Sequence, residues 1–98
     1  MIQHNVFFKW SDAMSPDIKQ QTIAALTALR DQVPGIIDLS IGDQCSPEGL
    51  GKDFHTGLSV RFVDASARDG YLIHPAHTVA VALFKPYMDD VIVMDYEC

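Results

Sequence analysis

Apolar and polar residues alternate over the first ten positions of the chain, so that even-numbered residues share one side of an extended backbone. A period of two indicates a half-buried strand, which we expect over residues 2–10. His4 falls on the same side as Val6 and Phe8, whereas Phe7 falls on the opposite side. The predicted strand therefore carries an imidazole on its core-facing side.

The pattern then changes to a helical period. Ser15 can cap a helix and Pro16 fits its first turn, whereas Pro34 and Gly35 end it. One stripe of this helix is predicted to be buried: Ile18, Thr22, Ala25, Leu26, Leu29 and Val33. The main core is predicted to form where Ile18, Leu26 and Leu29 pack on four strand residues: Val6, Phe8, Leu58 and Val60.

Two more strands are predicted over residues 36–42 and 54–63, on either side of a loop rich in Gly and Pro. The core-facing residues of these strands are expected to be Ile37, Leu39 and Ile41 in the first and Phe54, Thr56, Leu58, Val60 and Phe62 in the second.

The last third of the chain is predicted to hold a broken helix and a final strand. A helix capped by Asp64 is expected to run to Ile73, and Pro75 to break it, because proline disfavours helical geometry in the preceding residue. A second helix over 76–88, a turn at Asp89–Asp90 and a strand over 91–96 follow.

This order of elements, β-α-β-β-α-β, predicts an α+β ferredoxin-like fold with a four-stranded antiparallel sheet and both helices on one face. Its 98 residues fit a single domain over 1–98. The other face of the sheet would stay uncovered although it carries large apolar side chains: Phe7, Val63, Ile92, Met94 and Tyr96. Such a patch predicts a homodimer, in which a second copy covers this face.

The charge balance narrows the choice of partners. Asp and Glu number 13 against 7 Lys and Arg, and no basic cluster is present, which argues against nucleic acid and anionic membranes. No apolar run approaches the about 20 residues that span a bilayer, and the first residues lack a signal-peptide pattern. Cys45 and Cys98 form no CxxC pattern. We therefore expect a cytoplasmic protein.

His4, Tyr71 and His77 are the residues best suited to catalysis. The break at Pro75 would let two half-helices direct Tyr71 and His77 toward the histidine of the first strand. Neutral imidazoles can abstract a proton and a phenol can donate a hydrogen bond to an enolate oxygen. The alternative is a purely structural hydrogen-bonded cluster that fixes the break.

Other chemistry has less support in the sequence. His74 and Pro75 are predicted to be structural residues of the break. The break also spoils the helical geometry that His74 and His77 would need to bind a metal, so we predict no metal site. No nucleotide-binding motif is present, and we predict no cofactor.

Two segments resemble the stress-responsive A/B barrel (Dabb) domain family. The stretch from His4 to Trp10 resembles its His-x-apolar-x-apolar-Lys/Arg-aromatic strand. The stretch from Tyr71 to His77 resembles its Tyr-x-x-His-Pro-x-His signature, and the resemblance continues to Asp95–Tyr96. It covers the whole chain in the same order of elements and implies a dimeric α+β barrel.

The family includes a plant polyketide cyclase whose aldol chemistry uses a histidine of the first strand and a tyrosine and a histidine beside the His-Pro pair. The resemblance assigns these roles to His4, Tyr71 and His77. We expect the substrate to contact five residues: Ile23, Leu26, Leu58, Val60 and Met88. This chain departs from the cyclase where pocket aromatics are replaced by residues such as Thr22, Ile23 and Leu26, and where a histidine is replaced by Thr56.

Two hypotheses about function follow. The first is a cofactor-independent cyclase, lyase or isomerase that acts on a small hydrophobic carbonyl compound, polyketide-like or aromatic. The second is a non-catalytic homodimer that binds a small hydrophobic ligand or serves in a stress response. Cofactorless monooxygenase activity has less support. An open cavity between the sheet and the helices is compatible with both main hypotheses, whereas a filled interior argues against the enzyme.

Overall fold

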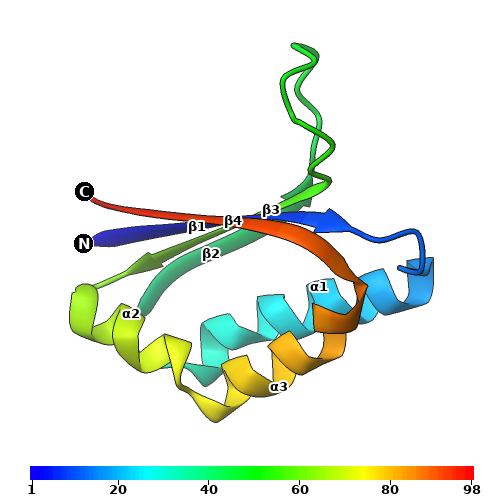
Figure 1. Cartoon of the computed structure of the whole chain (residues 1–98). Helices are drawn as coiled ribbons and strands as arrows, with labels where there is room; N and C mark the ends of the chain where they lie inside the picture. Colours follow the sequence, from blue (N-terminus) through cyan, green and yellow to red (C-terminus); the bar gives the residue numbers. More distant parts are fainter.

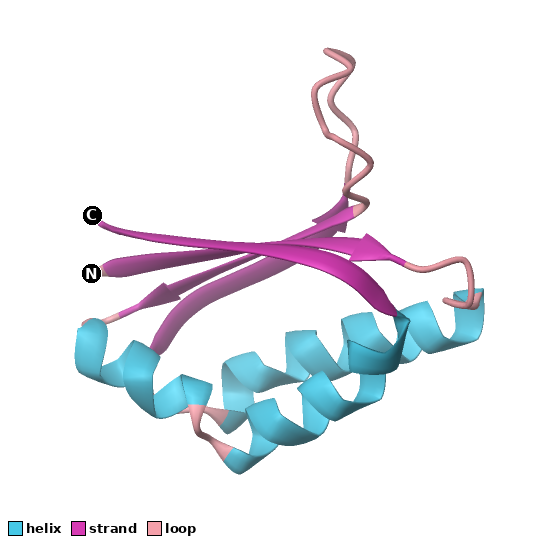
Figure 2. Ribbon diagram, viewed as in Figure 1, coloured by secondary structure: helices cyan, strands magenta, loops and turns pink.

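The computed structural model describes residues 1–98. Its elements are β1 (Ile2–Trp10), α1 (Pro16–Gln32), β2 (Ile36–Asp43), β3 (Thr56–Phe62), α2 (Ala65–Leu72), α3 (Pro75–Phe84), a single 3₁₀ turn η1 (Lys85–Tyr87) and β4 (Met88–Glu97). The strands form one antiparallel sheet in the order β2-β3-β1-β4. All three helices lie on one face of the sheet and the other face is bare (Figures 1 and 2). The predicted α+β ferredoxin-like fold is confirmed.

The register of the strands decides which side chains meet. One row across the sheet consists of Leu39, Val60, His4 and Asp95, which are direct cross-strand partners. Cross-strand partners share a face, and the burial of the first three shows that this row faces the helices. The strand pairing therefore places Asp95 beside His4 on the inner side of the sheet.

The core lies between this inner side and α1. The predicted helix residues Leu26 and Leu29 are buried, as are the strand residues expected to contact them: Val6, Phe8, Leu58 and Val60. Ile18 is only half-buried and lies outside the core cluster, so that part of the prediction is wrong. Ile18 lies at the beginning of α1, where Ser15 Oγ accepts a hydrogen bond from its backbone N–H at 3.2 Å.

The predicted core face of β2 is partly wrong. Leu39 is buried as expected, but the side chain of Ile37 is 46% exposed. The pairing with β3 shifts register between Ile36 and Asp38, which is a bulge that leaves Ile37 out of the alternation. Ile36, half-buried, packs against the core instead.

Two other boundaries differ from the prediction. The helix predicted over residues 76–88 corresponds to α3, which ends at Phe84, and Met88 begins β4. Asp89 and Asp90 are therefore exposed strand residues and form no turn. At the other end, β3 begins at Thr56 and Phe54 precedes it, half-buried beside the bare face. No helix combines the length and the apolar character that crossing a membrane requires.

Candidate active site

His4 is held on the inner face of β1 by a carboxylate. Its side chain is buried, with 4% of the residue exposed, and its Nδ1 lies 2.7 Å from Asp95 Oδ1. An ionised carboxylate only accepts hydrogen bonds, so Nδ1 carries a proton and donates a hydrogen bond to Asp95 Oδ1. In a neutral imidazole with its proton on Nδ1, the other ring nitrogen, Nε2, carries no proton and can accept one.

Tyr71 approaches His4 from α2. The residue is only 1% exposed, and its ring lies edge-on to the His4 imidazole with 5.8 Å between ring centroids. Burial raises the pKa of Tyr71 to about 12, so the phenol stays protonated at neutral pH. No side-chain polar atom that is fully buried lacks a hydrogen-bond partner. The Tyr71 hydroxyl makes no side-chain hydrogen bond in the structure, so this oxygen lies in the small accessible part of the residue.

His77 completes the group from the first turn of α3. Its ring centroid lies 4.5 Å from that of Tyr71, and its side chain is half-buried. Burial lowers the pKa of His77 below its ordinary value, and the nearby His4 adds to this, whereas a hydrogen bond with the backbone of Leu72 opposes it. At neutral pH His77 is therefore a neutral imidazole, the form that can accept a proton.

The break between α2 and α3 sets these directions. Pro75 occupies the first turn of α3, and the His74 side chain caps this helix by accepting a hydrogen bond from Ala76 N at 3.1 Å. Tyr71 lies at the end of α2 and His77 at the beginning of α3, on either side of this cap. The structure thus brings together all three residues that the sequence singled out for catalysis.

The five residues predicted to contact substrate divide into two groups. Leu26, Leu58 and Val60 are fully buried in the core cluster, whereas Ile23 and Met88 are half-buried. Their contact with a substrate stays a prediction.

Sequence reasoning missed two residues of the site. Asp95 binds His4 with one carboxylate oxygen, and its other oxygen, Oδ2, accepts a hydrogen bond from Arg68 Nη1 at 3.0 Å. Arg68 lies three residues before Tyr71, so both side chains leave the same side of α2. The signal for Asp95 was its place on the inner side of the last strand, at the alternate position from Val91 and Val93, where a carboxylate needs a partner.

The site lies beside an uncovered part of the sheet. Val91 and Val93 pair with the buried residues Phe8 and Val6 and share their face, yet Val91 is 36% exposed and Val93 is 57% exposed. The helix layer therefore ends short of β4. The row that holds His4 and Asp95 is thus next to an apolar surface that a ligand can reach.

A second polar cluster lies further along the sheet, at Thr56. The Thr56 hydroxyl accepts a hydrogen bond from Trp10 Nε1 and donates one to Asp43 Oδ1, both at 2.9 Å. Lys19 Nζ binds the other oxygen of Asp43 at 2.7 Å, and this hydrogen bond is the largest cause that lowers the pKa of Asp43. Thr56 pairs with Phe8, four residues along β1 from His4. This cluster is therefore separate from the trio formed by His4, Tyr71 and His77.

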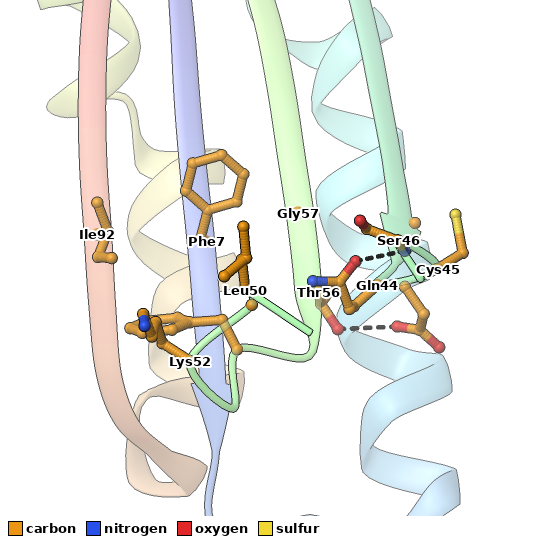
Figure 3. A pocket seen from close by; sticks show the side chains of 13 residues that line it. Phe7, Gln44, Cys45, Ser46, Leu50, Lys52, Thr56, Gly57 and Ile92 are labelled. Atoms are coloured by element: carbon orange, nitrogen blue, oxygen red, sulfur yellow. Dashed lines mark hydrogen bonds between the residues drawn. The ribbon is translucent and has the colours of Figure 1, made fainter. Parts of the chain in front are cut away.

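A pocket of about 530 Å³ is lined by residues of the bare face of the sheet, such as Phe7 and Ile92, and by the loop between β2 and β3. In Figure 3, Phe7, Leu50 and Lys52 lie at one side of it and Gln44, Cys45 and Ser46 at the other. A neighbouring pocket of about 340 Å³ shares Phe7 and two glycines with it. Neither pocket includes His4, Tyr71 or His77, so neither is the cavity between the sheet and the helices that the enzyme hypothesis expects. No three His, Cys, Asp or Glu side chains are grouped closely enough to hold a metal ion.

The fold and the sequence together define the class of protein. Four antiparallel strands with helices on one face are the ferredoxin-like arrangement of α+β proteins. Residues 2–98 match the sequence profile of the stress responsive A/B barrel domain, Dabb. The chain therefore belongs to the Dabb family.

Known proteins similar to this chain come from bacteria and plants. The uncharacterized protein SCO4036 of Streptomyces coelicolor is 35% identical over 100 residues, which cover 99% of each chain. A dimeric ferredoxin-like protein of unknown function from Thermobifida fusca has a TM-score of 0.87 at 23% identity and covers 99% of this chain and 90% of its own. The hydroxynitrile lyase of Passiflora edulis has a TM-score of 0.88 at 20% identity, covering 97% and 90%.

Proposed function

We propose that this protein is a cofactor-independent enzyme that moves a proton on a small hydrophobic carbonyl compound, in a cyclase, lyase or isomerase reaction. The observation that carries the proposal is the convergence of His4, Tyr71 and His77 from three elements. Tyr71 is a buried residue whose ring contacts both His4 and His77, and its phenol is a hydrogen-bond donor. A hydrogen-bond donor of this kind is free to bind a carbonyl oxygen.

The chemistry follows from the ionisation of the three groups. His77 accepts a proton from the carbon next to the carbonyl, and the electron pair of that C–H bond moves onto the carbonyl oxygen as an enolate. The Tyr71 hydroxyl donates its hydrogen bond to this oxygen, where the negative charge develops. In an isomerase the protonated His77 returns the proton to a different carbon. In a cyclase the enolate carbon attacks a second carbonyl, and the resulting alkoxide takes the proton.

Burial prepares both groups for these opposite tasks. It lowers the pKa of His77, which keeps the base unprotonated, and it raises the pKa of Tyr71 to about 12, which keeps the donor protonated. Titratable neighbours whose environments favour different protonation states are typical of acid–base sites. His4, with Asp95 on its Nδ1, supplies a second proton acceptor at Nε2.

Two further observations support the proposal. The apolar side chains of Val91 and Val93 stay exposed on the inner side of β4, which suits a hydrophobic substrate rather than a charged one. The Passiflora protein of the same fold is a hydroxynitrile lyase, a name that agrees with lyase chemistry on this architecture.

The proposed working form is a homodimer that covers the bare face of the sheet. This face exposes large apolar residues, all at least 44% exposed: Phe7, Ile92, Met94 and Tyr96. Solvent-exposed patches of this kind mark interaction sites. The similar structure from Thermobifida fusca is described as dimeric, which supports the same arrangement here.

Hydrogen exchange tests the activity even where the product of the reaction is unknown. A panel of small ketones and polyketide-like carbonyl compounds is incubated with the protein in D₂O, and NMR follows deuterium uptake at the carbon next to the carbonyl. His77→Ala and Tyr71→Phe are expected to lower the exchange rate by about 10²–10⁴-fold. Tyr87→Phe, which changes a half-buried tyrosine outside the site, is the matched control. Exchange that survives in both site variants would rule out the proposed roles.

The second candidate function is ligand binding without chemistry. It is favoured by the position of the pocket of about 530 Å³, which lies on the face of the sheet opposite to the trio. The same compounds then bind without accelerated exchange. Binding that is lost in Leu50→Asp, a change in the pocket lining, and kept in Tyr71→Phe would support this alternative.

A further inference from the structure

Four side chains form a continuous chain of hydrogen bonds from α2 to the first strand: Asp69, Arg68, Asp95 and His4. Arg68 Nη1 donates to Asp95 Oδ2 at 3.0 Å, and Asp95 Oδ1 accepts from His4 Nδ1 at 2.7 Å. Arg68 also donates from Nε to Asp69 Oδ1 at 3.1 Å. The two edges of the guanidinium are therefore held by different carboxylates.

The two carboxylates differ in their surroundings. The side chain of Asp69 is 68% exposed, whereas those of Arg68 and Asp95 are 25% and 20% exposed. Water weakens the ion pair between Arg68 and Asp69 more than the pair between Arg68 and Asp95, because exposed charges are screened. Hydrogen bonds to Asp95 and then to Asp69 raise the pKa of Arg68, which stays a cation at any pH of interest.

The arginine also decides which oxygen Asp95 offers to His4. A carboxylate bound by His4 alone can rotate and accept with either oxygen, or turn toward water. With Oδ2 occupied by the guanidinium, Oδ1 faces the imidazole and the carboxylate plane is fixed. Groups that hold the partner of a histidine in this way determine its tautomer and ring orientation.

The position of Arg68 in the chain links this effect to the rest of the site. Arg68 and Tyr71 leave the same side of α2, one turn apart, so one short helix places the phenol beside His4 and the guanidinium on Asp95. A shift of α2 would move both groups at once.

We infer that Arg68 is a positioning residue for His4. By fixing the Asp95 carboxylate, it keeps the proton of His4 on Nδ1 and leaves Nε2 as the proton-accepting nitrogen of the neutral ring. The use of Nε2 in catalysis rests on the proposed function, whereas the effect on the tautomer does not.

Long-range ¹H–¹⁵N NMR spectra of the histidine side chains of the whole protein test the inference directly, with His4→Gln used to assign the His4 signals. In the unchanged protein, His4 is expected to show the Nδ1-protonated pattern. Arg68→Gln removes the cation, and the His4 signals are expected to move toward a mixture of both tautomers. Arg68→Lys keeps the charge but not the two-sided fork, and an intermediate spectrum is expected.

Two controls separate positioning from a general effect on the fold. Arg30→Gln removes an exposed arginine that lies 3.6 Å from Asp38, and it is expected to leave the His4 spectrum unchanged. Asp69→Asn removes the other partner of Arg68 and is also expected to leave it unchanged. A His4 spectrum in Arg68→Gln equal to that of the unchanged protein would overturn the inference. If Arg68→Gln does not fold, Arg68→Lys takes its place, and a His4 spectrum in Arg68→Lys equal to that of the unchanged protein would overturn the inference.

The exchange assay adds a functional readout. Arg68→Gln is expected to lower the rate about 10- to 100-fold, the range typical of residues that orient a reactive group. A changed tautomer in this variant, together with no exchange activity even in the unchanged protein, would contradict the proposed function and leave the positioning role in place. An unchanged tautomer contradicts the positioning role whatever the activity.

Discussion

His4 and Asp95 are direct partners in the ladder between β1 and β4, and a hydrogen bond of 2.7 Å joins their side chains although 91 positions separate them in the sequence. The pairing supplies a buried imidazole with a carboxylate at a point where the sheet is otherwise lined by apolar residues. Site geometry in this protein is thus a property of strand register as well as of its sequence motif.

The hydrogen bond between these residues contributes to stability. Asp95→Asn keeps the shape of the side chain but removes the charge that binds His4 and Arg68. We expect the free energy of unfolding in urea to fall by about 1–3 kcal/mol, as for hydrogen bonds to charged groups. Asp89→Asn, an exposed change in the same strand, is the control and should stay within about 0.5 kcal/mol of the unchanged protein. Equal values for both variants would contradict the prediction.

The buried phenol of Tyr71 should titrate late. The chain has three tyrosines, and burial raises the pKa of Tyr71 from 10.0 to about 12. Ultraviolet absorbance of tyrosinate is expected to show a step near pH 12 that disappears in Tyr71→Phe. The unfolded chain loses this proton first, so the contribution to stability is complete below pH 10 and is lost as the pH rises toward 12. Complete titration near pH 10 in the folded protein would contradict this.

His77 should make stability depend on pH in the opposite range. Its pKa in the folded protein lies below the ordinary 6.5, mainly because of burial. The unfolded chain therefore binds a proton first as the pH falls, so stability is present above pH 6.5 and is lost as the pH falls through the folded-state pKa. His77→Gln has no proton to gain. Urea unfolding between about pH 7.5 and about pH 5.5 should give a smaller slope for this variant, and an equal slope would refute the shift.

The bare sheet face should carry the contact between two copies. Met94 is 62% exposed on this face, and Met94→Asp would bury a carboxylate in the interface at a cost of several kcal/mol. Light scattering is expected to give a dimer mass for the unchanged protein at micromolar concentration and a monomer mass for the variant. Val79→Asp, at a 72% exposed position of α3, is the control and should leave the dimer intact. A monomer mass for the unchanged protein would end the dimer hypothesis.

The core between α1 and the sheet should respond strongly to a cavity. Leu29 has no exposed surface, and Leu29→Ala is expected to lower the free energy of unfolding by about 2–5 kcal/mol. Thr27→Ala, an exposed change in the same helix, should stay within about 0.5 kcal/mol. A loss below about 0.5 kcal/mol for Leu29→Ala would mean that the buried stripe of α1 is misassigned.

Local patterns predicted the order of elements because each signal was strong by itself. The alternation of β1, the Ser15–Pro16 start of α1 and the break at Pro75 depend only on neighbouring residues, and each lies where it was expected. The bulge at Ile37 was missed because it depends on the pairing of β2 with β3. Met88 and Phe54 were misplaced at element ends, where local patterns decide least.

The site was predicted in the same partial way. Tyr71 and His77 could be found because they lie on either side of a visible proline, and His4 because a histidine interrupts an apolar face. Asp95 and Arg68 could not be assigned to His4 from the sequence, since their contact requires the register of β4 against β1 and the placement of α2.

The place of β1 between β3 and β4 has a consequence for how the chain folds. Pairing between segments so distant in sequence is slow, because a long loop must close before any contact rewards it. Until β4 adds on, β1 is an edge strand with unpaired backbone groups that can join another chain. Asp95 arrives with that same strand. We therefore expect the aggregation-prone stage of folding to end at the moment when His4 gains its carboxylate partner.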